Sequence, residues 1–198
     1  MKWNKVVAMT TYDRSLRFIR RYFEAERNII SKLDVEKIFD CIKILQQARD
    51  RASQIFVIGN GGSASTASHM VTDFNKGART DGPSFRLYCL SDNIPSLTAI
   101  GNDLSYDDIF AYQLRGVYQR GDVLLAISGS GNSRNIIKAA KFVKNQGGEV
   151  VALVGFDGGK LLSLADSAVH IPSQDMQLVE DLHLSLNHVM MRCCLEML

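Results

Sequence analysis

The segment GDVLLAISGSGNS (residues 121–133) decides how this chain folds. Its first part, Val123–Ile127, is apolar on both faces, which is typical of a strand that is covered on both sides of a sheet. Its second part alternates glycine with hydroxyl residues, and the stretch Arg134–Asn145 that follows has helical periodicity. The segment therefore predicts a strand, a loop and a helix, in that order.

The same unit recurs along the chain. Further strands are predicted at Gln54–Ile58, Phe85–Cys89, Val150–Val154 and Ala168–Ile171. Helical patterns lie between or after them, from residue 63 to about Asn75, near Pro95–Ala99 and Tyr106–Gln113, and from Val179 to Leu198. This alternation predicts an α/β fold with a five-stranded parallel sheet flanked by helices, of the flavodoxin-like doubly wound type.

Two helices precede this unit. Tyr12–Leu33 is amphipathic, and Asp34 is a suitable N-cap for a second helix that runs to about Ala52. They are extra to a minimal doubly wound unit, and they carry apolar faces that a monomer does not fully cover. We therefore expect residues 1–52 to form a helical extension that serves oligomerisation, and residues 53–198 to form the sheet domain.

Composition excludes several classes of function. The chain of 198 residues is 46% hydrophobic and 22% charged, with a net charge of +2, and no long basic run points to nucleic acid. The apolar stretches are too short to span a bilayer, and the N-terminus is a poor signal peptide. None of the four cysteines forms a CxxC pair, so we expect reduced thiols and a cytoplasmic location.

Two glycine-rich loops are candidates for phosphate binding. GNGGS (59–63) and SGSGNS (128–133) each lie between a strand and a helix, where backbone N–H groups and the helix dipole attract anions. Neither has the lysine of a nucleotide-binding P-loop or the GxGxxG spacing, so a phosphomonoester fits better than a nucleotide. The alternative is that the serines merely cap the helices.

His69 and Asp73 are four residues apart on one predicted helix and share a face. That spacing suits a metal site or a proton-transfer pair, and equally a pair that is only exposed to solvent or only contributes to helix packing. His183 is either a ligand or a core histidine, whereas His170 lies in a predicted strand and is interpreted as structural.

Three motifs in this order, GNGGSAS, ISGSGNS and GFDGGKL, resemble the SIS (sugar isomerase) domain family. Within it the chain is similar to phosphoheptose isomerases, which interconvert sedoheptulose 7-phosphate and glycero-manno-heptose 7-phosphate. The resemblance runs from about Ile55 to His188, and the paired N-terminal helices also suit this subfamily. It implies a single SIS domain, a homotetramer with sites at subunit interfaces, and a product that feeds heptose synthesis for lipopolysaccharide or another surface glycan.

The resemblance also implies roles for individual residues. Asp73 and His188 match the acid/base pair of the isomerase, and the ligand set for a possible zinc ion is His69, Asp73, Glu180 and His188. The substrate-binding positions are Asn60, Gly61, Gly62, Ser63, Asn102, Asp103, Ser128, Gly129, Ser130, Ser133 and Glu180. Two positions depart from the family: Asp73 stands where glutamate is usual, and Glu180 stands where glutamine is usual.

Two other functions remain open at this point. Some SIS relatives are non-catalytic binding or regulatory proteins, such as a partner of the bacterial replication initiator. An isomerase for a hexose or pentose phosphate would use the same phosphate loops, although the paired N-terminal helices favour the heptose type.

Overall fold

The computed structural model describes residues 10–78 and 82–196, and the chain divides into two compact units after Lys32. The first unit contains one described helix, α1 (Thr11–Ile30). It begins with a capping box, in which the Thr10 side chain accepts the Asp13 N–H and the Asp13 carboxylate accepts the Thr10 N–H. The predicted helix is confirmed, and it ends a few residues before Leu33.

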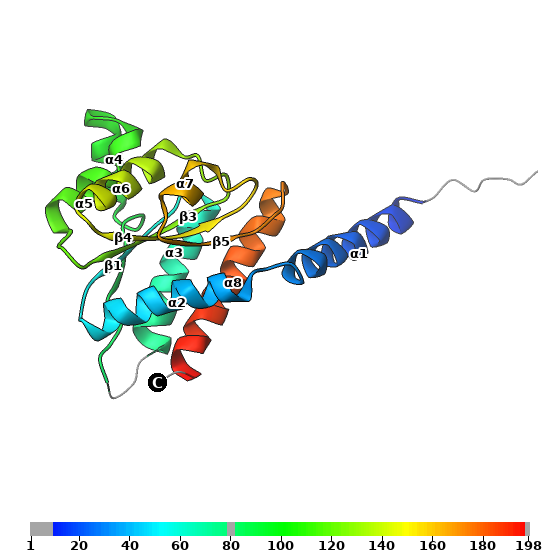
Figure 1. Cartoon of the computed structure of the whole chain (residues 1–198). Helices are drawn as coiled ribbons and strands as arrows, with labels where there is room; N and C mark the ends of the chain where they lie inside the picture. The colour runs from blue at the N-terminus through cyan, green and yellow to red at the C-terminus, as the bar shows by residue number, and fades with distance from the viewer. Residues whose placement is uncertain (1–9, 79–81, 197–198) are drawn as a thin grey trace, which may run out of the picture. The chain divides into compact units, whose positions relative to one another are not determined.

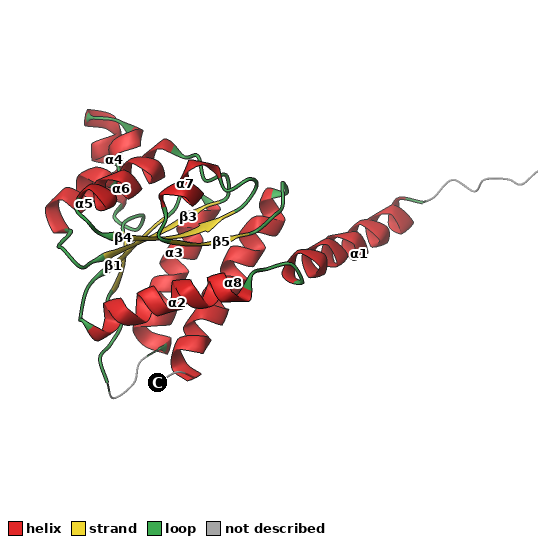
Figure 2. Ribbon diagram, in the orientation of Figure 1, coloured by secondary structure: helices red, strands yellow, loops and turns green. Residues whose placement is uncertain are grey.

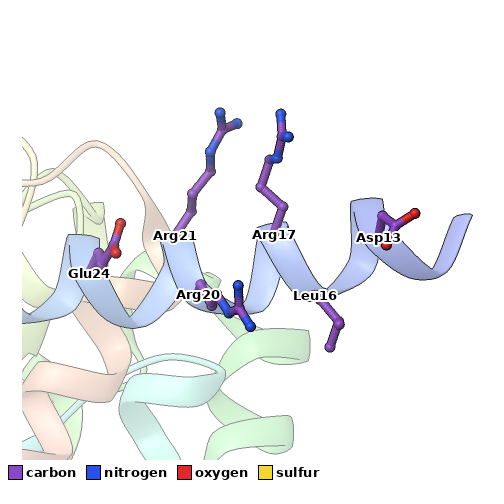
Figure 3. Close-up of a pocket in the computed structure, with 6 residues that line it drawn as sticks. All are labelled: Asp13, Leu16, Arg17, Arg20, Arg21 and Glu24. Atoms are coloured by element: carbon purple, nitrogen blue, oxygen red, sulfur yellow. The ribbon is translucent and has the colours of Figure 1, made fainter. Parts of the chain in front are cut away.

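The surface of α1 carries both exposed apolar side chains and arginines. Large side chains are exposed along it, including Phe18 and Phe23, at 67% and 62%. Figure 3 shows Arg17 and Arg21 extending from the same side of the helix. Every residue that lines the hollow in Figure 3 belongs to α1, so it is a surface groove of one helix rather than an enclosed site.

The second unit, Leu33–Leu198, is built on a parallel sheet of five strands among its described residues. The strands are β1 (Ile55–Ile58), β2 (Leu87–Cys89), β3 (Val123–Ser128), β4 (Glu149–Val154) and β5 (Ser167–His170). Their order is β2-β1-β3-β4-β5, and every neighbouring pair is parallel. Strands β1 and β3 are buried along their whole length, as their apolar sequences require. The predicted fold class is confirmed.

Helices cover both faces of the sheet, which forms the middle layer in Figures 1 and 2. On one face lie α2 (Val35–Asp50), α3 (Gly62–Thr72) and α8 (Met176–Glu196). On the other lie α5 (Ala111–Val117), α6 (Arg134–Asn145) and α7 (Gly159–Leu164), with α4 (Ile94–Asp103) beyond them. The core of this second face joins Leu124 and Ala126 of β3 to Ile136 and Ala140 of α6.

Helix α2 belongs to the sheet unit. Asp34 caps it as predicted, accepting the Lys37 N–H at 3.0 Å. The helix packs against β5 and α8, and its apolar side chains Ile42 and Leu45 are buried there. The compact unit therefore starts at Leu33, and an oligomerisation role for residues 1–52 stays a prediction.

The local structure differs from the prediction in two places. Helix α3 ends at Thr72 and continues as a π-helical turn, η1 (Asp73–Gly77), in which the Ala78 N–H bonds the Asp73 carbonyl oxygen. Such turns insert one extra residue into a helix and are frequent at functional sites. Helix α7 was not predicted, because it is short, follows Gly158 and begins at Gly159, and both glycines have positive φ.

No helix among the described residues combines the length and apolarity needed to cross a membrane. The four cysteines, all among the described residues, form no disulfide, and burial raises the pKa of Cys41 to about 11.

Candidate active site

The two glycine-serine loops meet at the carboxyl edge of the sheet. Strands β1 and β3 are neighbours, with Ile58 beside Ala126, so the loops that follow them lie next to each other. They enclose a cavity of about 150 Å³ together with the start of α8. It is lined by Asn60, Ser63, Ile127, Ser128, Gly129, Ser130, Ser133, Met176 and Glu180. The structure thus brings together most of the predicted substrate-binding residues.

Glycine is required where the loop after β3 touches the loop after β4. Gly131 has φ +61°, and a Cβ there would overlap the carbonyl oxygen of Gly158. The backbone continues this contact, since the Leu161 N–H bonds the Gly131 carbonyl oxygen at 2.9 Å and the Gly155 N–H bonds that of Gly129. Backbone bonds therefore hold the loop to the segment after β4, while Ser128, Ser130 and Ser133 line the cavity.

Helix capping does not account for all of the serines. Ser133 is the N-cap residue of α6, yet its side chain makes no capping hydrogen bond. Ser130 accepts the Asn132 N–H at 3.2 Å within the loop. Ser133 lines the cavity at the N-terminus of a twelve-residue helix, where the dipole favours an anion.

Asn60 is held by two side chains that sequence reasoning missed. Asn60 and Asn135 exchange two amide hydrogen bonds of 3.0 and 2.8 Å, and the Tyr106 hydroxyl donates to Asn60 Oδ1 at 3.0 Å. Asn135 is buried at 2% exposure in the first turn of α6. No local pattern marks these partners, because they lie far from Asn60 in the sequence.

His69, Asp73 and His188 converge from two helices. The Asp73 Oδ2 atom lies 3.3 Å from His69 Nε2 and 3.4 Å from His188 Nε2, and the two Nε2 atoms are 3.5 Å apart. Both histidine side chains are nearly half exposed, at 45% and 48%, whereas the Asp73 side chain is 20% exposed. The three offer one oxygen and two nitrogen ligands within 4.8 Å of one another.

Helices α3 and α8 pack side by side and run in the same direction, which places the site along their contact (Figure 1). At one end a Cβ on Gly62 would lie 2.5 Å from the Glu180 carboxylate oxygens. At the other end His69 meets His188. Glu180 therefore lies at the end with the glycine-serine loops and is not in the three-residue group that the described residues form around Asp73.

Asn187 is a further member of the cluster that the sequence did not reveal. Its side chain is fully buried, and its amide donates to Asp73 Oδ2 at 2.7 Å. Its Oδ1 atom has no hydrogen-bond partner among the described residues. An unpaired buried oxygen of this kind costs about 1–3 kcal/mol.

The other two histidines are not part of the cluster. His183 is fully buried, and this burial lowers the pKa of its ring to about 4, so it is a neutral core histidine. His170 lies on β5 and bonds the Phe156 carbonyl oxygen at 2.9 Å, as expected of a structural residue.

Four predicted residues lie outside the cavity lining, and one of them, Gly62, lies against Glu180. Gly61 is the N-cap residue of α3, at φ +53°, and faces open space. Asn102 and Asp103 are exposed at the end of α4, where the Asn102 amide donates to Asp103 Oδ1 at 2.8 Å. Within the single chain they contact each other, and a substrate contact at these positions stays a prediction.

Comparison with known proteins identifies the family and the fold. Residues 21–155 match the SIS domain family. A phosphoheptose isomerase of Thermodesulfovibrio yellowstonii is 32% identical over 90% of this chain and 85% of the relative, and one of Alteromonas mediterranea is 37% identical over 82% and 84%. The structure of phosphoheptose isomerase GmhA from Neisseria gonorrhoeae superposes with a TM-score of 0.84 at 30% identity, covering 93% of this chain and 98% of that one. The chain therefore belongs to the SIS domain family and, within it, to the phosphoheptose isomerases.

Proposed function

We propose that this protein is a ketose–aldose isomerase that converts sedoheptulose 7-phosphate into D-glycero-D-manno-heptose 7-phosphate. The observation that carries the proposal is the meeting of His69, Asp73 and His188 beside a serine-lined cavity, along one helix–helix contact. The names of the related enzymes support the same reaction and give no support to a non-catalytic binding protein.

The phosphate of the substrate binds in the serine-lined cavity. Ser128, Ser130 and Ser133 supply hydroxyl groups, and the N-terminus of α6 supplies backbone N–H groups and a favourable dipole. Asn60, oriented by Asn135, is placed to bind a sugar hydroxyl. A phosphomonoester offers the three oxygens that such a set of donors can bind.

The distance between the serine-lined cavity and the cluster around Asp73 suits a seven-carbon chain. From Ser63 to His69 helix α3 rises about 9 Å. An extended seven-carbon sugar spans roughly 8 Å between its terminal carbons. With the phosphate on C7 in the cavity, C1 and C2 come within reach of the cluster around Asp73.

Isomerisation moves one proton between carbons and one between oxygens. The Asp73 carboxylate takes a proton from C1 of the ketose and returns it to C2 of the enediol. His188 gives a proton to the C2 oxygen as the enediol forms and takes one from the C1 hydroxyl as the aldose forms. Each carbon and each oxygen then has the protons that the product requires.

The cluster also fits a zinc ion. Zinc takes nitrogen and oxygen ligands at about 2.0–2.1 Å in a tetrahedron, so two of its ligands are about 3.3 Å apart. The three ligand atoms of His69, Asp73 and His188 are separated by 3.3, 3.4 and 3.5 Å. When bound there, zinc would act as a Lewis acid that polarises a carbonyl oxygen. Glu180 as a fourth ligand stays a prediction, because its carboxylate lies beside Gly62.

The proposal extends to the assembly of the enzyme and to the use of its product. The exposed apolar side chains of α1 support a homotetramer built through the N-terminal helices, with active sites at subunit interfaces. Asn102 and Asp103, exposed in the single chain, would contact substrate in that assembly. The enzyme would act in the cytoplasm and supply heptose for surface glycans.

Turnover of sedoheptulose 7-phosphate, followed by NMR with and without added zinc, tests the proposal. Asp73→Asn and His188→Ala should each lower kcat by about 10²–10⁴-fold, as expected when an acid or base is removed. His170→Ala, a histidine outside the cluster, is the matched control and should retain activity. Bound sugar phosphate without turnover in the wild-type protein would instead indicate a binding or regulatory function.

A further inference from the structure

Asn187 is an unusual residue for its position. Helix α8 buries an otherwise largely apolar set of side chains against α2 and α3, including Leu186 and Met190 on either side of Asn187. An apolar side chain of similar size would fill the same space and leave no polar atom unpaired. Asn187 instead leaves its Oδ1 atom buried without a partner among the described residues. Packing alone therefore does not explain the amide.

The one bond that Asn187 makes points to its role. Its amide donates to Asp73 Oδ2 at 2.7 Å, across 114 positions of sequence. The opposite orientation of the amide would bring its oxygen against the carboxylate, so the electrostatics determine which atom faces Asp73. The oxygen that receives this bond is also the one that lies 3.3 and 3.4 Å from His69 and His188.

Asp73 needs such a support because its side chain is short and partly exposed. It occupies the first position of the π-helical turn η1, and it is the residue that is one methylene shorter than the usual glutamate of its family. Without a fixed donor, the carboxylate is free to turn away from the two histidines toward solvent. A buried amide donor holds it between them.

We infer that Asn187 is a positioning residue, which holds the Asp73 carboxylate in place for proton transfer and for a metal ion. The inference rests on the proposed function in so far as it assigns those tasks to Asp73. Hydrogen-bonded partners of metal ligands generally act in this way, and their loss typically lowers metal affinity or activity about 10–100-fold.

The test compares Asn187→Leu with the wild-type protein and with Met190→Leu, a buried substitution on the same helix that leaves the amide in place. Zinc affinity is measured by competition with a chelator, and crystal structures of the metal-free proteins show where Asp73 points. We expect Asn187→Leu to bind zinc about 10–100-fold more weakly, with Asp73 turned from the histidines and the melting temperature unchanged or raised. Met190→Leu should match the wild type in zinc affinity.

Two results would overturn the inference: zinc affinity within about twofold of the wild type, or an Asp73 carboxylate that keeps its place between the histidines in Asn187→Leu. If Asn187→Leu fails to fold, Asn187→Ala removes the same donor and is judged in the same way. A wild-type protein that neither binds zinc nor isomerises the sugar contradicts the proposed function alone, because the position of Asp73 in the variant still decides the role of Asn187.

Discussion

The buried histidine His183 should make the fold sensitive to acid, and His183→Leu should remove that sensitivity. Burial lowers the pKa of His183 from 6.5 to about 4 in the folded protein. Below pH 6.5 the unfolded chain therefore binds a proton that the folded chain does not bind until about pH 4. The contribution of His183 to the free energy of unfolding is fully present above pH 6.5 and is lost as the pH falls. The loss is roughly 2 kcal/mol at about pH 5 and about 3 kcal/mol below pH 4.

Urea unfolding, followed by circular dichroism at about pH 7.5 and about pH 5 in the presence of a chelator, measures this difference. His183→Leu should lose roughly 2 kcal/mol less than the wild type between the two pH values. Leu186→Ala, a core substitution on the same helix, should lower stability at both pH values and retain the wild-type difference. Equal pH differences in His183→Leu and the wild type would refute the assignment of a neutral, buried imidazole.

Three further substitutions probe the phosphate end of the site. Gly131→Ala combines a positive φ with overlap of the Gly158 carbonyl oxygen, so the free energy of unfolding in urea should fall by more than about 1–2 kcal/mol. A smaller effect would contradict a rigid loop. Ser133→Ala should raise KM about 10-fold while leaving the urea midpoint unchanged, because this serine makes no capping bond; a drop in stability of about 1 kcal/mol would show that it caps the helix. Tyr106→Phe removes the hydroxyl bond to Asn60 and should weaken binding of sedoheptulose 7-phosphate by about 0.5–1.5 kcal/mol in calorimetry, whereas unchanged affinity would separate Tyr106 from the site.

The sequence predicted the parts of the site that depend on local order. A strand, a glycine-serine loop and a helix follow one another within residues 121–145, and each has its own pattern of side chains. The loops after β1 and β3 lie at one sheet edge because parallel strands all end on the same side, so their proximity follows from the predicted fold. The partners of these loops were not predictable in this way, since Tyr106 and Asn135 lie 46 and 75 positions from Asn60.

The cluster around Asp73 was likewise only partly predictable from the sequence. The spacing of His69 and Asp73 indicated a shared helix face, and the family resemblance suggested His188, but neither indicated Asn187. The π-helical turn that begins at Asp73 also has no pattern of its own, because a single inserted residue leaves the helical periodicity before it intact.

By itself, the sequence determined the parallel α/β architecture and the two glycine-serine loops, because apolar periodicity and glycine placement act over a few neighbouring residues. Only the tertiary structure decided which polar side chains share a site. Helices α3 and α8 pack in parallel, so their residues meet in pairs, with Gly62 beside Glu180 and His69 beside His188. The rise of a helix separates these pairs by about 10–12 Å, which is why Glu180 lies with the glycine-serine loops and His188 with Asp73.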